Sequence, residues 1–124
     1  MEQSILNNVK KVLGLAPTYT PFDEDVIMHI NAAFSVLAQL GVGPIEGFTI
    51  EDETAVWGDF MLIAGSESSL SLVKTYIYLK VKVLFDPPGT SFLLESANNQ
   101  IKEYEWRLNV AREYVLPPRV EEPL

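Results

Sequence analysis

Residues able to do acid–base or metal chemistry are few in this chain and poorly spaced for it. Its 124 residues include one histidine, His29, and no cysteine. His29 follows Asp25 by four positions, so both side chains would share one helical face, but one such pair gives too few ligands for a transition-metal site. Carboxylate metal centres in helix bundles use acids three or four residues apart, and no Asp or Glu here precedes another at that spacing. The sequence does not predict an enzyme, and it predicts no cofactor and no metal.

The glycine and serine residues form no phosphate-binding or nucleophile motif either. The run Gly41-Val42-Gly43-Pro44 lacks the spacing of a phosphate-binding loop and is typical of a helix end followed by a turn. Serine–histidine–acid chemistry would depend on His29, and no nucleophile-elbow sequence is present. A chain without cysteine forms no disulfide, which fits a protein made and assembled in a reducing cytoplasm.

Negative charge is concentrated in one segment. Residues 23–67 carry nine of the 17 acidic side chains and no Lys or Arg, and the net charge of the whole chain is −8. Such a segment repels DNA phosphates, so it is not the footprint of a DNA-binding protein. It is either a solvated face that keeps the protein soluble or a surface made not to retain DNA, such as the wall of a channel through which DNA slides.

Hydrophobic periodicity predicts a mainly α fold, a small four-helix bundle. The helices are expected near residues 4–14, 21–40, 67–86 and 91–116, with a short β-hairpin or an extended loop between the second and the third. Apolar residues make up 48% of the chain and the mean hydropathy is +0.12. No apolar run approaches the ~20 residues that span a bilayer, and the first residues lack the pattern of a signal peptide.

The third expected helix is apolar on nearly every side. A helix of this kind has to be covered all round, which places it at the centre of the bundle, and another subunit is one source of that cover. Pro87 and Pro88 end the helix at Asp86, because proline lacks an amide hydrogen and disfavours helical geometry in the residue before it. Ser91 is expected to cap the restart.

The last expected helix carries an unbroken apolar stripe. Its members alternate at spacings of three and four residues: Leu94, Ala97, Ile101, Tyr104, Leu108, Ala111 and Val115. Trp106 lies off this stripe, with Val110 one turn further along. Two interpretations are open for Trp106: it packs against a helix of its own chain, or it anchors a subunit contact, where Trp is enriched.

The cations of the third helix have two interpretations as well. Lys74, Lys80 and Lys82 do not share one helical face, so they form no compact basic patch. Either their aliphatic stems cover apolar neighbours while the ammonium groups stay in water, or they pair with the acidic segment 46–59 of a neighbouring copy.

Taken together in order, several short motifs resemble the head–tail connector (adaptor) proteins of long-tailed double-stranded DNA phages. None is diagnostic alone, but their order and spacing cover the chain from Ile5 to about Val115. The motifs are Ile27-Met28-His29-Ile30-Asn31, Gln39-Leu40-Gly41-Val42-Gly43-Pro44, Trp57-Gly58-Asp59-Phe60, Lys74-Thr75-Tyr76-Ile77-Tyr78-Leu79-Lys80, Phe85-Asp86-Pro87-Pro88 and Tyr104-Glu105-Trp106-Arg107-Leu108-Asn109.

The resemblance implies a structural virion protein. In similar proteins about twelve copies of a small helical bundle form a ring under the portal of the filled head, as expected of a closed symmetric assembly. The ring extends the DNA channel and joins the head to the tail. The implied partners are further copies of the chain, the portal protein, the next neck or tail-completion protein, and genomic DNA that passes without specific binding. The implied location is the neck of the virion, with assembly in the bacterial host cytoplasm and no membrane.

The resemblance also suggests where each surface lies. The domain is expected to span 1–116, followed by an extended proline-rich tail over 117–124. The candidate residues fall into three groups: for the channel or its rim, Glu46, Glu51, Asp52, Glu53 and Asp59; for the subunit contact, Trp106, Val110, Lys80 and Lys82; and for the portal contact, Arg119, Val120 and Leu124.

An acidic protein-binding module is the alternative hypothesis. A protein that imitates the charge of DNA could occupy a nuclease or a repressor. That function needs acids distributed along one surface, whereas here they cluster in a single segment that precedes an apolar helix.

Overall fold

The computed structural model of the chain describes residues 4–43, 47–64 and 67–115, and for 61–64, 67–69 and 111–115 it describes the backbone only. Within these ranges the fold is mainly helical, as predicted, with five helices rather than four. They are α1 (Ile5–Val12), α2 (Asp23–Gln39), α3 (Trp57–Ala64), α4 (Glu67–Phe85) and α5 (Ser91–Val115).

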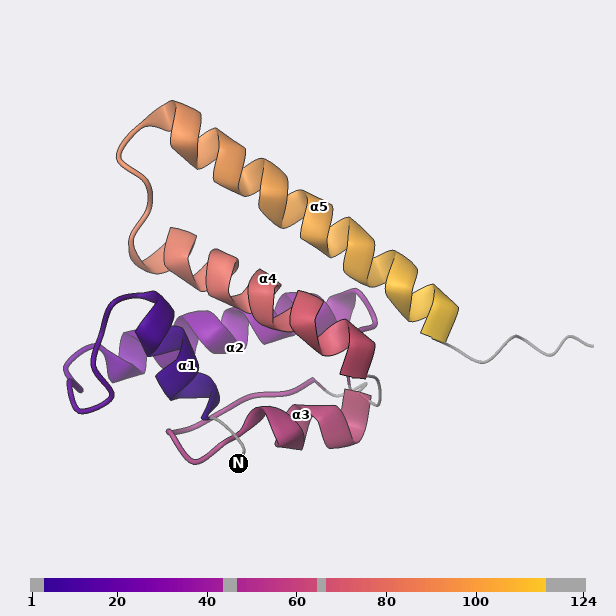
Figure 1. The fold of residues 1–124 in the computed structure, drawn as a ribbon, viewed down its shortest axis with the longest axis horizontal. Helices are drawn as coiled ribbons and strands as arrows, with labels where there is room; N and C mark the ends of the chain where they lie inside the picture. Colours follow the sequence, from indigo (N-terminus) through magenta and orange to yellow (C-terminus); the bar gives the residue numbers. More distant parts are fainter. Residues whose placement is uncertain (1–3, 44–46, 65–66, 116–124) are drawn as a thin grey trace, which may run out of the picture.

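The central element is α4. It packs against α2 on one side and against α5 on the other, and it also contacts α1 (Figure 1). Four of its side chains are fully buried: Val73, Tyr76, Ile77 and Val81. The central position predicted from its apolar sequence is therefore confirmed, because neighbours on several sides remove most of its apolar surface from water. The cover is incomplete at the C-terminal end, where Leu84 is 44% exposed.

Short-range hydrogen bonds set the ends of α1. The Ser4 hydroxyl accepts a hydrogen bond from the amide of Asn7 at 3.2 Å, which satisfies one of the free donors of the first turn. After Leu13 the chain passes through Gly14 at φ 83°, a left-handed conformation that glycine adopts without a Cβ penalty.

The start of α2 differs from the expectation. Thr20-Pro21 has the residue types of a cap followed by proline at the first helical position, but the helix begins at Asp23. Its N-cap position is occupied by Phe22, whose side chain makes no capping hydrogen bond. The first turn carries Asp23, Glu24 and Asp25, and these acids favour the positive end of the helix dipole without a side-chain cap.

The α4–α5 connection lies where the two prolines predict it. The last helical residue of α4 is Phe85, and the Asp86 amide closes the last turn on the Lys82 carbonyl at 2.8 Å. The prediction that Ser91 caps α5 is wrong by one residue. The Thr90 hydroxyl accepts the hydrogen bond from the Leu93 amide, at 3.2 Å. The two helices therefore run as an antiparallel pair joined by a short turn (Figure 1).

Between α2 and α4, residues 47–56 form an extended loop and residues 57–64 form the additional helix α3. In the described residues the backbone makes a single antiparallel bridge, between Ser4 and Val56, and no hairpin. Two side chains explain the difference. Asn31 of α2 binds both backbone groups of Ile50, at 2.8 and 3.0 Å, where a second strand would have paired. Asp59 accepts the Val56 amide at 3.0 Å, an arrangement that begins α3 where a strand was expected to continue.

The apolar stripe of α5 faces α4 as predicted. Ile101 and Leu108 are buried, and Leu94, Ala97 and Tyr104 are partly buried on the same side. Glu103 and Arg107, four residues apart, form an ion pair on the solvent side at 2.7 Å, with both side chains more than half exposed.

Truncating the centre of α4 tests its burial. We expect Ile77→Ala to lower the free energy of unfolding by about 2–5 kcal/mol, because Ile77 is fully buried and its loss leaves a cavity. The measurement is urea unfolding at equilibrium. Thr75→Ala, an exposed position on the same helix, is the matched control and should change stability by less than about 0.5 kcal/mol. Equal effects from the two substitutions would contradict the central position of α4.

Candidate functional site

The acidic turn at residues 51–53 is exposed and held from both ends. Glu51, Asp52 and Glu53 all face solvent. On its N-terminal side Ile50 is buried and tied to Asn31, and on its C-terminal side the Ala55 carbonyl accepts the Ile5 amide at 3.0 Å. This anchoring presents the turn on a fixed base.

The acids of this region differ in what they do locally. Asp52 accepts hydrogen bonds from the hydroxyl and the amide of Thr54, which lower its pKa below the usual range for Asp. The Asp59 carboxylate accepts the hydrogen bond from the Val56 amide at the start of α3. Glu51 and Glu53 show no ion pair with any residue of the described part, so their charges are free for an external surface. Glu46, the fifth candidate, lies outside the described residues.

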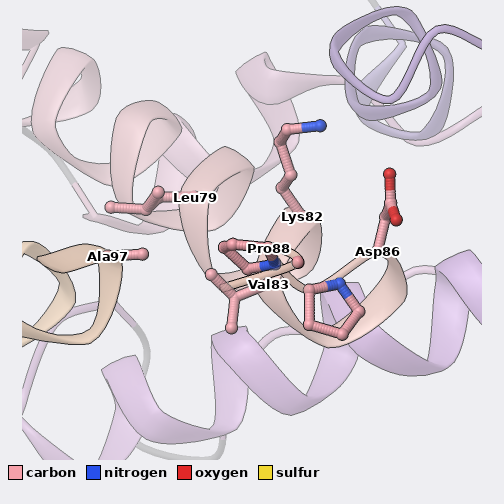
Figure 2. A pocket seen from close by; sticks show the side chains of 8 residues that line it. Leu79, Lys82, Val83, Asp86, Pro88 and Ala97 are labelled. Atoms are coloured by element: carbon pink, nitrogen blue, oxygen red, sulfur yellow. The ribbon is translucent and has the colours of Figure 1, made fainter. Parts of the chain in front are cut away.

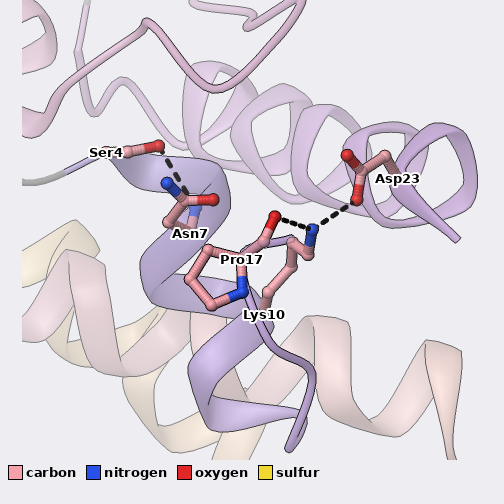
Figure 3. A network of polar contacts seen from close by, with 5 residues as sticks. All are labelled: Ser4, Asn7, Lys10, Pro17 and Asp23. Atoms are coloured by element: carbon pink, nitrogen blue, oxygen red, sulfur yellow. Dashed lines mark hydrogen bonds and ion pairs between the residues drawn. The ribbon is translucent and has the colours of Figure 1, made fainter. Parts of the chain in front are cut away.

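A buried lysine neutralises one acid of the negative segment. Lys10 of α1 is 0% exposed, and its ammonium contacts Asp23 Oδ1 at 2.8 Å and the Pro17 carbonyl at 3.0 Å (Figure 3). The contact joins the end of α1, the 13–22 loop and the first turn of α2. Sequence reasoning missed this pair, because the 12 residues between its members leave no helical spacing to reveal it. The charge that the segment offers to an external partner is smaller by one than its count of acids suggests.

Trp57 links α3 to two other helices. Its indole N–H donates to Asn8 Oδ1 at 2.8 Å, and Lys74 lies over its ring at 5.4 Å from the centroid. Lys74 therefore has a partner within its own chain, a cation–π contact that neither interpretation of these lysines included. Lys80 is half-buried and Lys82 is exposed, and the structure does not bring the two together with Trp106.

Trp106 does not pack into its own chain. It is 65% exposed, on the side of α5 that faces away from α4, and Val110 one turn on is partly buried. The interpretation that Trp106 packs against a helix of its own chain is wrong. An exposed Trp of this kind is compatible with a contact between molecules. Arg119, Val120 and Leu124 lie outside the described residues.

A shallow apolar depression lies at the turn between α4 and α5. It has a volume of about 360 Å³, and its floor is made by Leu79, Val83, Pro88 and Ala97 (Figure 2). Lys82 and Asp86 extend along its rim and do not converge on one point (Figure 2). An apolar floor without convergent polar groups offers surface for packing but no group for bond-making chemistry.

The described residues show no arrangement suited to metal binding. No three His, Asp or Glu side chains among them lie close enough to share an ion, and His29 is half-buried on α2. Nor does any helix in the described ranges have the length and apolarity needed to cross a membrane.

One polar contact fixes α5 to α4. The Tyr76 hydroxyl donates to Glu105 Oε2 at 2.8 Å. Burial raises the pKa of Tyr76 above its usual value, and the hydrogen bond and charge of Glu105 add to the effect. Sequence reasoning placed Tyr76 in an apolar helix and did not identify this contact.

The Tyr76–Glu105 contact predicts a loss of stability at alkaline pH. Above pH ~10 the unfolded chain releases the Tyr76 phenol proton, whereas the folded state retains it. The contribution of the protonated Tyr76 to stability is therefore fully present below about pH 10 and is lost as the pH rises further. We expect the unfolding free energy to fall with pH there, by up to about 1.4 kcal/mol per unit for this one group. Tyr76→Phe should make the decline less steep.

Denaturant unfolding from pH 8 to about 11 checks the slope. Glu105→Gln, which leaves Tyr76 buried, is the control and should retain most of the decline, because burial is the larger cause. Identical slopes for the wild type and Tyr76→Phe would contradict the assignment.

A comparison with known protein families matches the chain to one of them. A family model described as phage connector protein matches residues 5–115, nearly the whole chain and every described helix. Neither a curated protein nor a solved structure gave a significant match.

Proposed function

The chain belongs to the phage connector protein family, and from that premise we propose that it forms a ring under the portal of the filled head. The observation that carries this function is the family match over residues 5–115. A connector is a structural part of the head–tail junction, so the family supports a structural role in the neck of the virion rather than catalysis. In the proposed ring, about twelve copies extend the DNA channel and present a platform to the next neck or tail-completion protein.

Two features of the structure support an assembly role. The described surfaces combine an apolar depression with large exposed apolar side chains, including Trp106 and Phe92, and such side chains are candidates for contacts between molecules. The acidic turn at 51–53 is exposed and anchored, as a channel wall or rim requires. The acidic binding module has less support, because Lys10 neutralises Asp23 and the fully exposed acids of residues 51–53 occupy one short turn.

The direct test is the place of the chain in phage particles. Filled heads purified from an infection that lacks the chain should remain without tails, and added protein should bind at the portal vertex and restore tail attachment. Immunogold labelling and infectivity report the two steps. Normal phage without the chain, or label distributed over the whole capsid, would contradict the proposed function.

The acidic turn is proposed to line the channel or its rim. Replacing Glu51 and Glu53 by Lys should slow DNA ejection or reduce DNA retention after packaging, because ammonium groups bind the phosphates that carboxylates repel. Asp52 is left unchanged, since it also organises the turn through Thr54. The measurement is the rate of ejection from purified phage.

Replacing the same two residues by Gln gives a graded control that removes negative charge without adding positive charge, and its effect should be smaller. Ejection and titre equal to the wild type in the Lys variant would exclude a channel position for the turn.

The tail is proposed to bind the portal through Arg119, Val120 and Leu124. A chain truncated after Leu116 should fold, because the described core lies before this point, and should co-sediment less with portal rings. A full-length chain with Glu121→Gln and Glu122→Gln keeps the three contact residues and should bind normally. Undiminished binding by the truncated chain would remove the tail from the portal contact.

A further inference from the structure

The structure leaves two different aromatic surfaces uncovered, and we propose that they bind each other between neighbouring copies of the chain. The end patch consists of Tyr19, Phe22, Leu84 and Phe85. The outer face of α5 consists of Phe92, Lys102 and Trp106. This inference rests on the proposed ring and specifies which faces close it.

The end patch joins two segments that are distant in the sequence, residues 19–22 and 84–85. The ring of Phe22 lies 5.9 Å from that of Tyr19 and 5.4 Å from that of Phe85, between centroids. Yet the cluster is not covered: Tyr19 is 45% exposed, Phe22 39% and Leu84 44%. The start of α2, the loop before it and the end of α4 thus meet in an aromatic surface that remains in contact with water.

The position of Phe22 is unfavourable for α2 itself. An N-cap Ser, Thr, Asp or Asn typically stabilises a helix by about 1 kcal/mol relative to a residue that cannot cap. Phe22 occupies this position with no capping hydrogen bond. Departures from local helix chemistry are expected where a side chain serves function, and here the gain is a half-exposed ring at the surface.

The outer face of α5 points away from the bundle. Trp106 is 65% exposed and Phe92 76%. At 100° per residue, Phe92 and Trp106 fall on the side of the helix opposite the buried Ile101 and Leu108, and Lys102 lies one turn before Trp106. No described helix of the same chain covers this side.

The charges beside Phe22 and beside Trp106 are complementary, and the exposed Glu95 lies further along α5, near Phe92. Next to Phe22, Glu24 and Asp25 are exposed and have no ion pair among the described residues, while Asp23 is neutralised by Lys10. Beside Leu84 and Phe85, the charges of Lys82 and Asp86 are opposite in sign and add no net charge to the end patch. On α5, Glu103 and Arg107 pair with each other, which leaves the exposed Lys102 as the cation beside Trp106. Trp106 on the end patch would bring Lys102 toward Glu24 or Asp25.

The location of the surfaces selects a head-to-tail contact. The loop before α2 and the end of α4 lie at one end of the molecule, and the second half of α5 extends toward the other (Figure 1). Two different surfaces that bind each other form a heterologous contact, which closes into a ring when the rotation between copies permits. Pairing of α5 with α5 would instead stop at a two-fold dimer and would place Lys102 of one copy near Lys102 of the other.

Cysteine cross-linking separates these arrangements, because the natural chain has no cysteine. The full chain with both Phe22→Cys and Trp106→Cys, concentrated and treated with a short bismaleimide, should give a ladder of covalent oligomers on denaturing gels. A mixture of the two single variants should stop at dimers, and each single variant alone should remain monomeric. Leu93→Cys replaces Trp106→Cys in the control, since Leu93 is 53% exposed on another side of the same helix, and it should give no ladder.

Charge reversal checks the same contact independently. Lys102→Glu in the double-cysteine chain should weaken the ladder, and the further change Glu24→Lys should restore it. Strong dimers from Trp106→Cys alone would assign α5 to a two-fold contact and overturn the proposal. A double variant that stays monomeric, while Trp106→Ala loses binding to portal rings, would assign the face to the portal and would also overturn it.

The outcome is separable from that of the proposed function. If no ladder forms but the chain still labels the portal vertex, the connector role stands and this interface is wrong. If the ladder forms but the chain is absent from heads, the interface stands and the location is wrong.

Discussion

The burial of α4 is the constraint on which the rest of the structure depends. A helix with apolar residues on nearly every side is stable in water only when other elements enclose it. In this chain α2 and α1 cover one part of it and α5 another, so the position of each follows from the need to cover α4. A buried polar group needs a hydrogen-bond partner. Tyr76, which is buried between α4 and α5, meets this need because its hydroxyl donates a hydrogen bond to Glu105.

A single chain of this length covers α4 but leaves large apolar side chains exposed at the surface. The side of α5 that meets α4 is buried, and the opposite side exposes Trp106 and Phe92 to water. At the end of α4 the ring of Phe22 packs on Phe85, and Leu84 stays exposed. A monomer with this much uncovered apolar surface is what an assembly subunit of the phage connector family would present, because neighbouring molecules complete the burial.

The sequence predicted those features that depend on local spacing. The apolar stripe of α5 and the stop of α4 before Pro87 both involve residues within a few turns of each other. It did not predict contacts between residues far apart in the chain. The bonds of Asn31 to Ile50 and of Trp57 to Asn8 involve ordinary residue types with no spacing signal. They hold the 47–56 loop against α2 and the start of α3 against α1. For the candidate sites, spacing identified Trp106 as lying off the stripe, but only the fold shows that no helix of the described ranges covers it.

We propose above all that several copies of this chain form a ring at the portal vertex. A cryo-electron microscopy reconstruction of the neck of filled heads, made without imposed symmetry, tests this arrangement. It should show a ring of these helical subunits between the portal and the tail, with α5 of each subunit packed against the α2–α4 end of the next. A neck in which this chain is absent, or in which it is bound as an isolated copy without neighbours, would contradict the ring.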